Sequence, residues 1–187
     1  MHDKVTLRRA ALAKRRALPA DVHERAAENL LGYLDRLPIQ ANAMVSGFWP
    51  IQAEINPLPL MRALRDRGCG LCLPAILDKT TIAFREWSSD DALVDTGYGT
   101  RGPDEDAKIV DPDVLLVPIA VFDRSGGRIG YGAGYYDRAI EKLRIKRRSP
   151  RLIGIAFSCQ EIETVPIEPH DQALELVATE LEIIQCQ

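Results

Sequence analysis

Short apolar runs alternate along the chain with longer segments in which apolar residues recur at helical spacing. The helical pattern predicts four helices, at residues 4–18, 21–37, 57–67 and 135–144. Asp21 is the expected N-cap of the second helix, and Pro57 suits the first turn of the third. The apolar runs predict six short strands, at 44–48, 70–73, 82–84, 114–117, 152–156 and 181–184.

The order of these elements predicts the fold class. Val114–Val117 is a continuous apolar run, which is typical of a strand covered on both faces. Because strands and helices alternate, we expect an α/β three-layer sandwich, in which a mostly parallel sheet carries helices on both faces. Pro74 is expected to stop the strand at 70–73, and residues 88–112 to form a long surface loop. No repeat or linker divides the chain, so one domain over 1–187 is expected.

Composition narrows the class of protein. The 187 residues include 24 Lys and Arg against 27 Asp and Glu, and this balance argues against a dedicated nucleic-acid binder. The apolar runs are too short to cross a bilayer, and the basic first 16 residues lack the apolar core of a signal peptide. A cytoplasmic protein without membrane contact is therefore expected. The cysteines are interpreted as buried, reduced thiols rather than metal ligands; they are Cys69, Cys72, Cys159 and Cys186.

The most informative segment runs from Asp113 to Arg138. A predicted buried strand leads into a loop with five of the 13 glycines, and the loop opens the last predicted helix. A glycine-rich loop at a helix N-terminus can present backbone N–H groups to a phosphate. Arg128 can add a cation, and Asp137 in the first helical turn can hold Mg²⁺. The spacing matches neither G-x-G-x-x-G nor the Walker motif, so a plain tight turn remains open.

The string Arg128-Ile-Gly-Tyr-Gly-Ala-Gly-Tyr-Tyr-Asp-Arg138 closely resembles the signature of the 5-formyltetrahydrofolate cyclo-ligase family, also called 5,10-methenyltetrahydrofolate synthetase. Other segments match the family pattern in the same order along almost the whole chain. They are Lys4-x-x-Leu7-Arg8, Ala53-Glu54-Ile55, Val117-Pro118, Phe122-Asp123, Ile153–Phe157 and His170-Asp171. The resemblance implies an ATP- and Mg²⁺-dependent ligase that converts 5-formyltetrahydrofolate to 5,10-methenyltetrahydrofolate, with ADP and phosphate as products.

The resemblance also implies roles at the nucleotide site. The residues expected to contact ATP are Lys4, Arg8, Arg128, Gly130, Gly132, Gly134, Tyr135 and Tyr136. Arg128 and Tyr136 are the candidate catalytic residues, and Asp137 and Asp171 are expected to hold Mg²⁺, directly or through water. Spacing alone would instead make Lys4 a member of a solvated basic helix face, and would let the tyrosines simply pack the helix onto the sheet.

At the folate site, the resemblance implies that Glu54 hydrogen-bonds the pterin ring, with Trp49 and Tyr135 beside the substrate. A surface glutamate and a core tryptophan are the alternatives without the family. The basic cluster at 142–148 is interpreted as a solvated helix end rather than a polyglutamate or nucleic-acid contact. A monomer is expected, acting on folate with or without a polyglutamate tail. A related enzyme acting on another N-formyl or carboxyl substrate and a non-catalytic binding module are the competing hypotheses.

Three positions depart from the family pattern. Ala133 stands where a Lys often lies in the glycine-rich loop, which removes one cation from the expected phosphate site. Gly102-Pro103 replaces a frequent Glu-Pro, and Glu175 replaces a frequent Asp. The first two departures are expected to matter more than the third.

Overall fold

A seven-stranded sheet with strand order β11-β10-β9-β6-β1-β2-β3 organises the protein in the computed structural model, which describes residues 3–88, 91–97 and 99–187. The strands of this sheet are β1 (Met44–Ser46), β2 (Gly70–Ile76), β3 (Ile82–Glu86), β6 (Val114–Pro118), β9 (Arg151–Ile155), β10 (Leu176–Ala178) and β11 (Ile183–Gln185). Strands β10, β9, β6, β1 and β2 run parallel, and each edge carries one antiparallel strand.

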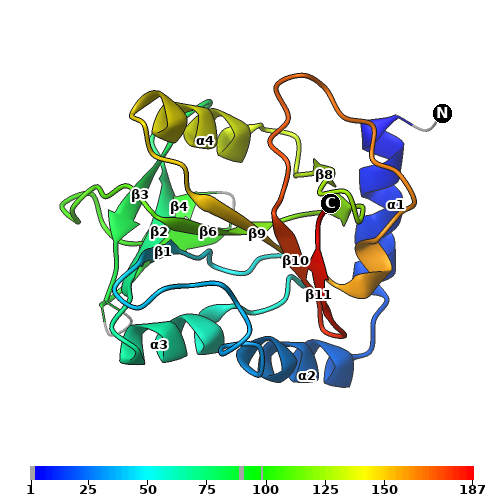
Figure 1. Ribbon diagram of the computed structural model, residues 1–187, viewed down its shortest axis with the longest axis horizontal. Coiled ribbons are helices and arrows are strands. Elements are labelled where there is room, and N and C mark those ends of the chain that lie inside the picture. The colour runs from blue at the N-terminus through cyan, green and yellow to red at the C-terminus, as the bar shows by residue number, and fades with distance from the viewer. Residues whose placement is uncertain (1–2, 89–90, 98) are drawn as a thin grey trace.

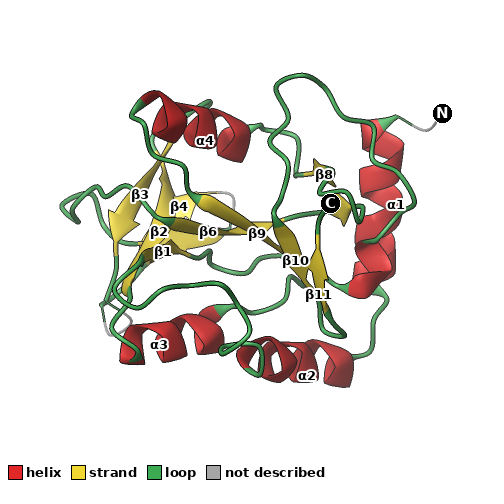
Figure 2. Cartoon of the chain, viewed as in Figure 1, coloured by secondary structure: helices red, strands yellow, loops and turns green. Residues whose placement is uncertain are grey.

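Helices lie on both faces of the sheet, which confirms the expected three-layer α/β fold (Figures 1 and 2). The helices are α1 (Lys4–Arg16), α2 (Ala20–Leu31), α3 (Leu58–Asp66) and α4 (Tyr135–Ile145). In Figure 1, α2 and α3 cover one face and α4 covers the other, while α1 stands beside the β10–β11 end of the sheet. Helix α1 packs on the short 3-10 helix η1 (Ser158–Gln160) and on the hairpin formed by β7 (Val121–Phe122) and β8 (Arg128–Ile129).

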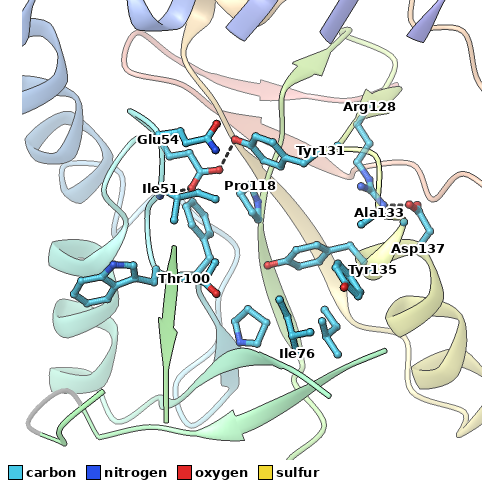
Figure 3. A pocket seen from close by; sticks show the side chains of 18 of the residues that line it. Ile51, Glu54, Ile76, Thr100, Pro118, Arg128, Tyr131, Ala133, Tyr135 and Asp137 are labelled. Atoms are coloured by element: carbon cyan, nitrogen blue, oxygen red, sulfur yellow. Dashed lines mark hydrogen bonds and ion pairs between the residues drawn. The ribbon is translucent and has the colours of Figure 1, made fainter. Parts of the chain in front are cut away.

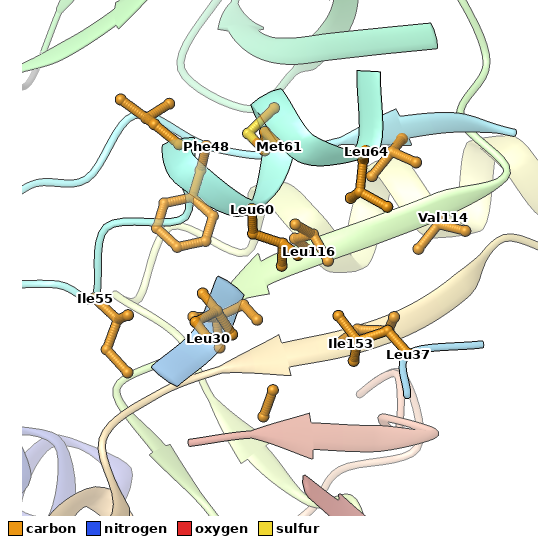
Figure 4. Close-up of a cluster of buried hydrophobic side chains, with 14 of the residues drawn as sticks. Leu30, Leu37, Phe48, Ile55, Leu60, Met61, Leu64, Val114, Leu116 and Ile153 are labelled. Atoms are coloured by element: carbon orange, nitrogen blue, oxygen red, sulfur yellow. The ribbon is translucent and has the colours of Figure 1, made fainter. Parts of the chain in front are cut away.

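The larger part of the core lies between the sheet and the helices α2 and α3. Leu30 of α2 and Leu60 of α3 are fully buried and face Leu116 of β6 (Figure 4). Truncating any of these side chains to Ala should cost about 2–5 kcal/mol. A second core under α4 holds Ile140 against the opposite face of β6, which is why the apolar run of that strand is continuous rather than alternating.

The chain reverses its direction of progress across the sheet between β1 and β6. Val45 of β1 pairs with Leu71 of β2 on one side and with Val114 of β6 on the other. The chain therefore adds strands first on one side of β1 and then on the other. In open α/β sheets, the loops that follow the carboxyl ends of the strands diverge at such a reversal. A crevice forms between these loops. The loops that follow β1, β2 and β6 therefore frame a cleft.

Several expected boundaries were wrong. Pro19, not Asp21, occupies the N-cap position of α2, and the helix ends at Leu31 because Gly32 and a series of turns follow. Pro74 does not stop β2, which continues to Ile76. The last residue of β2 that pairs with β1 is Cys72, so the missing N–H of Pro74 removes no bond to β1.

The expected structureless loop at 88–112 was also wrong. Strands β4 (Val94–Gly97) and β5 (Thr100–Gly102) form a hairpin within it. The backbone N–H of Val110 donates to Phe84 O, so the end of this segment is held against β3. Residues 89, 90 and 98 lie outside the described part. The hairpin β7–β8 and strand β10 were missed because runs of two or three residues carry no readable period.

Candidate active site

A cleft of about 660 Å³ opens at the reversal point of the sheet. Its walls come from the loop after β1, the end of β2, the β4–β5 hairpin, the end of β6 and the glycine-rich loop before α4. Figure 3 shows Glu54 and Tyr131 together at one side of the cleft, and Arg128 with Asp137 at another. The expected residues that line it are Arg8, Trp49, Glu54, Arg128, Gly130, Gly134, Tyr135, Tyr136 and Asp137.

The glycine-rich loop presents unpaired backbone donors beside the cleft. Within the described residues, the N–H groups of 131–134 donate no hydrogen bond to the protein. Gly134 is the N-cap of α4 in the left-handed region at φ 65°, and no side chain caps the helix. Gly130 has no heavy atom within 4 Å of the position a Cβ would take, so its missing side chain leaves open space. The loop has the geometry of an anion nest.

Arg128 and Asp137 form a nearly buried ion pair at the base of the loop. Arg128 Nη2 lies 2.5 Å from Asp137 Oδ1, and Arg128 Nε donates to Gln172 O at 3.0 Å. Burial lowers the pKa of Arg128, and the carboxylates of Asp137 and Asp171 oppose this shift. Asp137 Oδ1 also accepts from the N–H of Gln172, which leaves Oδ2 without a protein partner among the described residues.

Arg8 of α1 reaches the loop from the opposite side. Its Nε donates to Gly130 O at 2.7 Å, and its guanidinium lies 3.5 Å from where a Cβ of Gly132 would be. Gly132 adopts φ +103°, a conformation that favours glycine. The Arg8 side chain is thus fixed by a backbone carbonyl and packed against the loop that carries the free N–H groups.

Lys4 and Asp171 pair with each other rather than lining the cleft. Lys4 Nζ lies 2.6 Å from Asp171 Oδ2 and 3.2 Å from Glu168 Oε2. Burial alone would raise the pKa of Asp171, but the hydrogen bonds from Lys4 and from the N–H of Glu168 outweigh it and lower that pKa. Gln172, the next residue, contacts both Arg128 and Asp137, so this ion pair adjoins the base of the glycine-rich loop.

Glu54 follows β1 and faces the cleft from a constrained turn. Its Oε2 accepts from the N–H of Ile51 at 2.9 Å, and its Oε1 accepts from the hydroxyl of Tyr131. Burial raises the pKa of Glu54, while the hydrogen bonds from Tyr131 and Ile51 and the charge of Arg15 lower it. The residue is therefore a positioned carboxylate inside a cleft, rather than a surface glutamate.

The expected aromatic residues take separate positions around the cleft. Trp49 is half-buried and carries the guanidinium of Arg101 at 5.8 Å from its ring centroid. Tyr135 donates from its hydroxyl to Asp78 O at 3.3 Å, which ties α4 to the turn after β2. The Tyr136 hydroxyl is buried without a hydrogen-bond partner among the described residues. A buried hydroxyl without a partner costs free energy, and a ligand that supplies the hydrogen bond would remove this cost.

Four polar residues of the cleft region escaped the sequence analysis. Lys79 and Arg101 line the cleft from the turn after β2 and from β5. Tyr131 lines the cleft beside Glu54, and Arg15 of α1 donates to its hydroxyl. Tyr131 lies within the signature string but was given no role there. No motif marks the other three positions, but Arg15 lies seven residues after Arg8 and thus on the same face of α1, which was a readable signal.

The departures from the family pattern have distinct settings. Ala133 lines the cleft, and its carbonyl accepts from Arg138. A Cβ on Gly102 would lie 3.2 Å from Thr96 and 3.4 Å from Pro74 O, so a Glu would need the hairpin to shift. Glu175 accepts from the N–H of Leu152 and pairs with Arg151, outside the cleft. Members of the basic cluster at 142–148 pair with Asp111 and Asp113, as expected for a solvated helix end.

Three further expectations concern the cysteines, metal clusters and membrane contact. All four cysteines are free thiols; Cys69 and Cys72 are buried, whereas the other two are only half-buried. Within the described ranges, the acidic and His side chains that gather tightly enough for a metal are Glu168, His170 and Asp171, and Lys4 occupies this cluster. No helix in the described part of the chain is both long and apolar enough to cross a membrane.

Comparisons with known proteins agree with this architecture. A family model described as the 5-formyltetrahydrofolate cyclo-ligase family matches residues 1–180. A 5-formyltetrahydrofolate cyclo-ligase of Mycolicibacterium smegmatis is 33% identical over 94% of this chain and 93% of its own length. The Escherichia coli enzyme of the same name is 28% identical over 89% of this chain and 94% of its own length.

Solved structures give the same result. The structure of Aquifex aeolicus 5,10-methenyltetrahydrofolate synthetase superposes with a TM-score of 0.79, at 27% identity, and the match covers 97% of this chain and 92% of that one. A 5,10-methenyltetrahydrofolate synthetase from Mycoplasma pneumoniae shares the fold, with a TM-score of 0.74 over 94% of this chain and 98% of the other. The resemblance read from the sequence is confirmed, and the chain belongs to the 5-formyltetrahydrofolate cyclo-ligase family, whose members are ATP-dependent ligases.

Proposed function

We propose that this protein cyclises 5-formyltetrahydrofolate to 5,10-methenyltetrahydrofolate, with conversion of ATP to ADP and phosphate. The observation that carries the proposal is the pairing of two sites in one cleft. A glycine-rich loop with free N–H groups and two arginines suits a triphosphate, and the Glu54 carboxylate across the cleft suits a ring that offers N–H donors. Membership in the family supports the same reaction.

The chemistry requires positioning and charge neutralisation rather than a protein nucleophile. Transfer of the γ-phosphoryl group to the formyl oxygen gives an iminium phosphate, because the nitrogen lone pair of the formamide supplies the electrons. The anilino nitrogen then attacks the formyl carbon, loses its proton and closes the five-membered ring as phosphate leaves. Arg8 and Arg128 lie where they can neutralise the transferring phosphoryl group, and Tyr136 offers a buried hydroxyl beside it.

The residues beside the loop fit Mg²⁺, which usually binds through one or two carboxylates together with waters and phosphates. Asp137 lines the cleft and has one oxygen without a protein partner in the described part of the chain. Asp171 has Oδ2 engaged by Lys4 and keeps Oδ1 for a water-mediated contact. When bound, Mg²⁺ would offset the negative charge of the phosphates. Lys4 then acts on the nucleotide site by fixing Asp171.

At the folate end, Glu54 accepts hydrogen bonds from the pterin ring. Each of its carboxylate oxygens keeps one free acceptor position after its protein contact, which matches two adjacent N–H donors on a ligand. Trp49 supplies an apolar wall, and Tyr135 lies between the folate and nucleotide ends. Lys79 and Arg101 add positive charge to the cleft, which suits an anionic substrate with or without a polyglutamate tail. The protein acts as a single-domain monomer in the cytoplasm.

The test is to mix the purified protein with 5-formyltetrahydrofolate and Mg-ATP, and to follow the near-ultraviolet absorbance of the methenyl product. We expect a rise that requires the folate, ATP and the metal, that stops on addition of EDTA and that resumes with excess Mg²⁺. Release of one ADP per methenyl group confirms the stoichiometry. A flat trace with ATP bound would mean that another N-formyl or carboxyl compound is the substrate. A flat trace without ATP binding would overturn the nucleotide site as well.

A further inference from the structure

Arg15 is a charged side chain buried inside the protein. It lies in the last turn of α1 with 1% of its surface exposed. Its Nη1 donates to the hydroxyl of Tyr131 at 2.7 Å, and its Nη2 donates to Gln52 O at 2.8 Å. A buried guanidinium is costly and is retained where it holds other groups in place. The first contact joins α1 to the glycine-rich loop, and the second joins it to the turn before Glu54.

The partners of Arg15 converge on Glu54. Tyr131 lies in the glycine-rich loop, and its hydroxyl contacts both Arg15 and the Oε1 of Glu54. Arginine can only donate hydrogen bonds, so the Tyr131 oxygen must accept from Arg15. The single proton of the hydroxyl is then directed at Glu54. The direction of the chain from Arg15 through Tyr131 to Glu54 is therefore fixed by the chemistry of its first member.

The second contact of Arg15 holds the turn that carries Glu54. Gln52 and Ala53 adopt positive φ values of 47° and 67°, which are unfavourable for residues with a Cβ. Arg15 binds the carbonyl of Gln52, within this strained turn, and the carboxylate of Glu54 closes it by accepting from the N–H of Ile51. One guanidinium thus contacts both the turn and the tyrosine that orient the same carboxylate.

We propose that Arg15 and Tyr131 are positioning residues for folate recognition, which hold the Glu54 carboxylate in place and oriented toward the cleft. The proposal rests on the proposed function, since it takes Glu54 as the group that receives the pterin ring. A protonated Glu54 would lose one acceptor position, and a rotated one would lose its match to two adjacent N–H donors. Specificity for the folate then depends on Tyr131, which lines the cleft, and on Arg15, which does not.

The charges around Glu54 predict how its pKa changes when a neighbouring group is removed. Burial raises its pKa, while the Tyr131 hydrogen bond, the Ile51 N–H and the Arg15 charge lower it. Among the described residues, Tyr136 also interacts with Glu54, and its hydroxyl stays neutral because burial raises its pKa. Removing the Tyr131 hydroxyl must therefore raise the pKa of Glu54 further. The acid limb of kcat/KM for the folate should move to higher pH.

The experiment compares Tyr131→Phe and Arg15→Lys with the wild type, and uses Tyr33→Phe as the matched control. Tyr33 is buried beside α2 and does not line the cleft. We expect Tyr131→Phe to raise KM for 5-formyltetrahydrofolate about tenfold, the effect of one lost hydrogen bond to a charged group. KM for ATP and kcat should stay within about threefold of the wild type. Arg15→Lys keeps the charge but cannot reach both partners, so it should give a smaller change of the same kind.

Two readouts separate positioning from a merely structural role. If Tyr131 only shaped the glycine-rich loop, both KM values would rise together and the acid limb would stay in place, and either result would overturn the proposal. Calorimetric titration with 5-formyltetrahydrofolate measures its Kd directly, so the comparison stands even if turnover is absent. A wild type that binds the folate without turnover would contradict the reaction alone. A wild type that does not bind it would overturn both proposals.

Discussion

The guanidinium of Arg128 donates to the carboxylate of Asp137 across 2.5 Å, so two residues expected to hold different ligands are partners of each other. The side chain of Arg128 is 4% exposed and that of Asp137 is 23% exposed. The proposed phosphate site and the carboxylate proposed for Mg²⁺ are therefore built as one unit, and a change to either residue alters both. Removing the carboxylate also leaves a buried cation without its closest counter-charge.

Replacing Asp137 by Asn should impair both turnover and stability. We expect kcat to fall at least about 100-fold, the scale of one lost charge contact in a transition state, and unfolding free energy to fall by about 2 kcal/mol. Asp111→Asn is the control, because Asp111 pairs with Lys146 on the surface and should be neutral within about 0.5 kcal/mol. Near-normal turnover of Asp137→Asn would contradict its place in the site.

Arg8→Lys should affect ATP more than the folate. The Nε donor that binds Gly130 O is lost, and the remaining ammonium cannot pack against the loop as a planar guanidinium does. We expect KM for ATP to rise about tenfold, with KM for the folate within about threefold, in steady-state kinetics. Arg9→Lys on the exposed neighbouring position should leave both unchanged. An equal effect of the two substitutions would argue against a specific role of Arg8.

Glycines of the same segment should respond differently to alanine. At Gly126, φ is +90° and a Cβ would lie 2.5 Å from Leu174 O, so Gly126→Ala should destabilise the protein by at least about 2 kcal/mol. Gly130 has open space around it, so Gly130→Ala should fold normally and yet raise KM for ATP. Thermal unfolding together with kinetics separates the two effects. A destabilised Gly130→Ala protein would show that the fold, not the ligand, requires that glycine.

Asp123 should make stability depend on pH. Burial alone would raise its pKa, but hydrogen bonds from Val165, Ser125 and Gly127 outweigh it and lower that pKa. A carboxyl with a lowered folded-state pKa stabilises the fold above its unfolded pKa of about 3.9, and this contribution is lost as pH falls through the folded value.

Asp123→Asn should therefore cost about 2–3 kcal/mol at pH 7, and the difference from wild type should shrink below about pH 4. Urea unfolding of both proteins at pH 7, 5 and 3 measures this difference in the free energy of unfolding. Asp104→Asn, on an exposed turn, is the control and should show a difference near zero at each pH. A constant difference for Asp123→Asn across this range would mean that its ionisation does not contribute to stability.

Periodicity was sufficient to predict the main layers of the fold. The helix at 135–144 and the strand at 114–117 were found nearly to the residue, because both carry long or continuous apolar patterns. The β4–β5 hairpin was missed because its strands are mostly exposed and polar. Pro74 was misread because its cost depends on where β1 ends, which is a property of the sheet rather than of the local sequence.

The candidate site was likewise predicted only in part from the sequence. The motif around Arg128 located the glycine-rich loop, but no sequence signal indicated that Arg128 and Asp137 pair. Arg15 has no assigned role in the family pattern read from the sequence, and only the fold places it against Tyr131. The grouping of Lys4 with Asp171 joins residues 167 positions apart, and such contacts are invisible to any local pattern.

The position of α1 has a consequence for synthesis of the protein. This helix is made before the sheet, yet Arg8 and Lys4 bind partners that follow 122 and 167 residues later. A ribosome must release nearly the whole chain before α1 can take its place, since contacts of such long range form only once both partners exist. Nascent chains that end after β9 would contain every residue that lines the cleft but would lack Asp171, the partner of Lys4. The start of α1 would thus become anchored only once translation has passed the segment that follows β9.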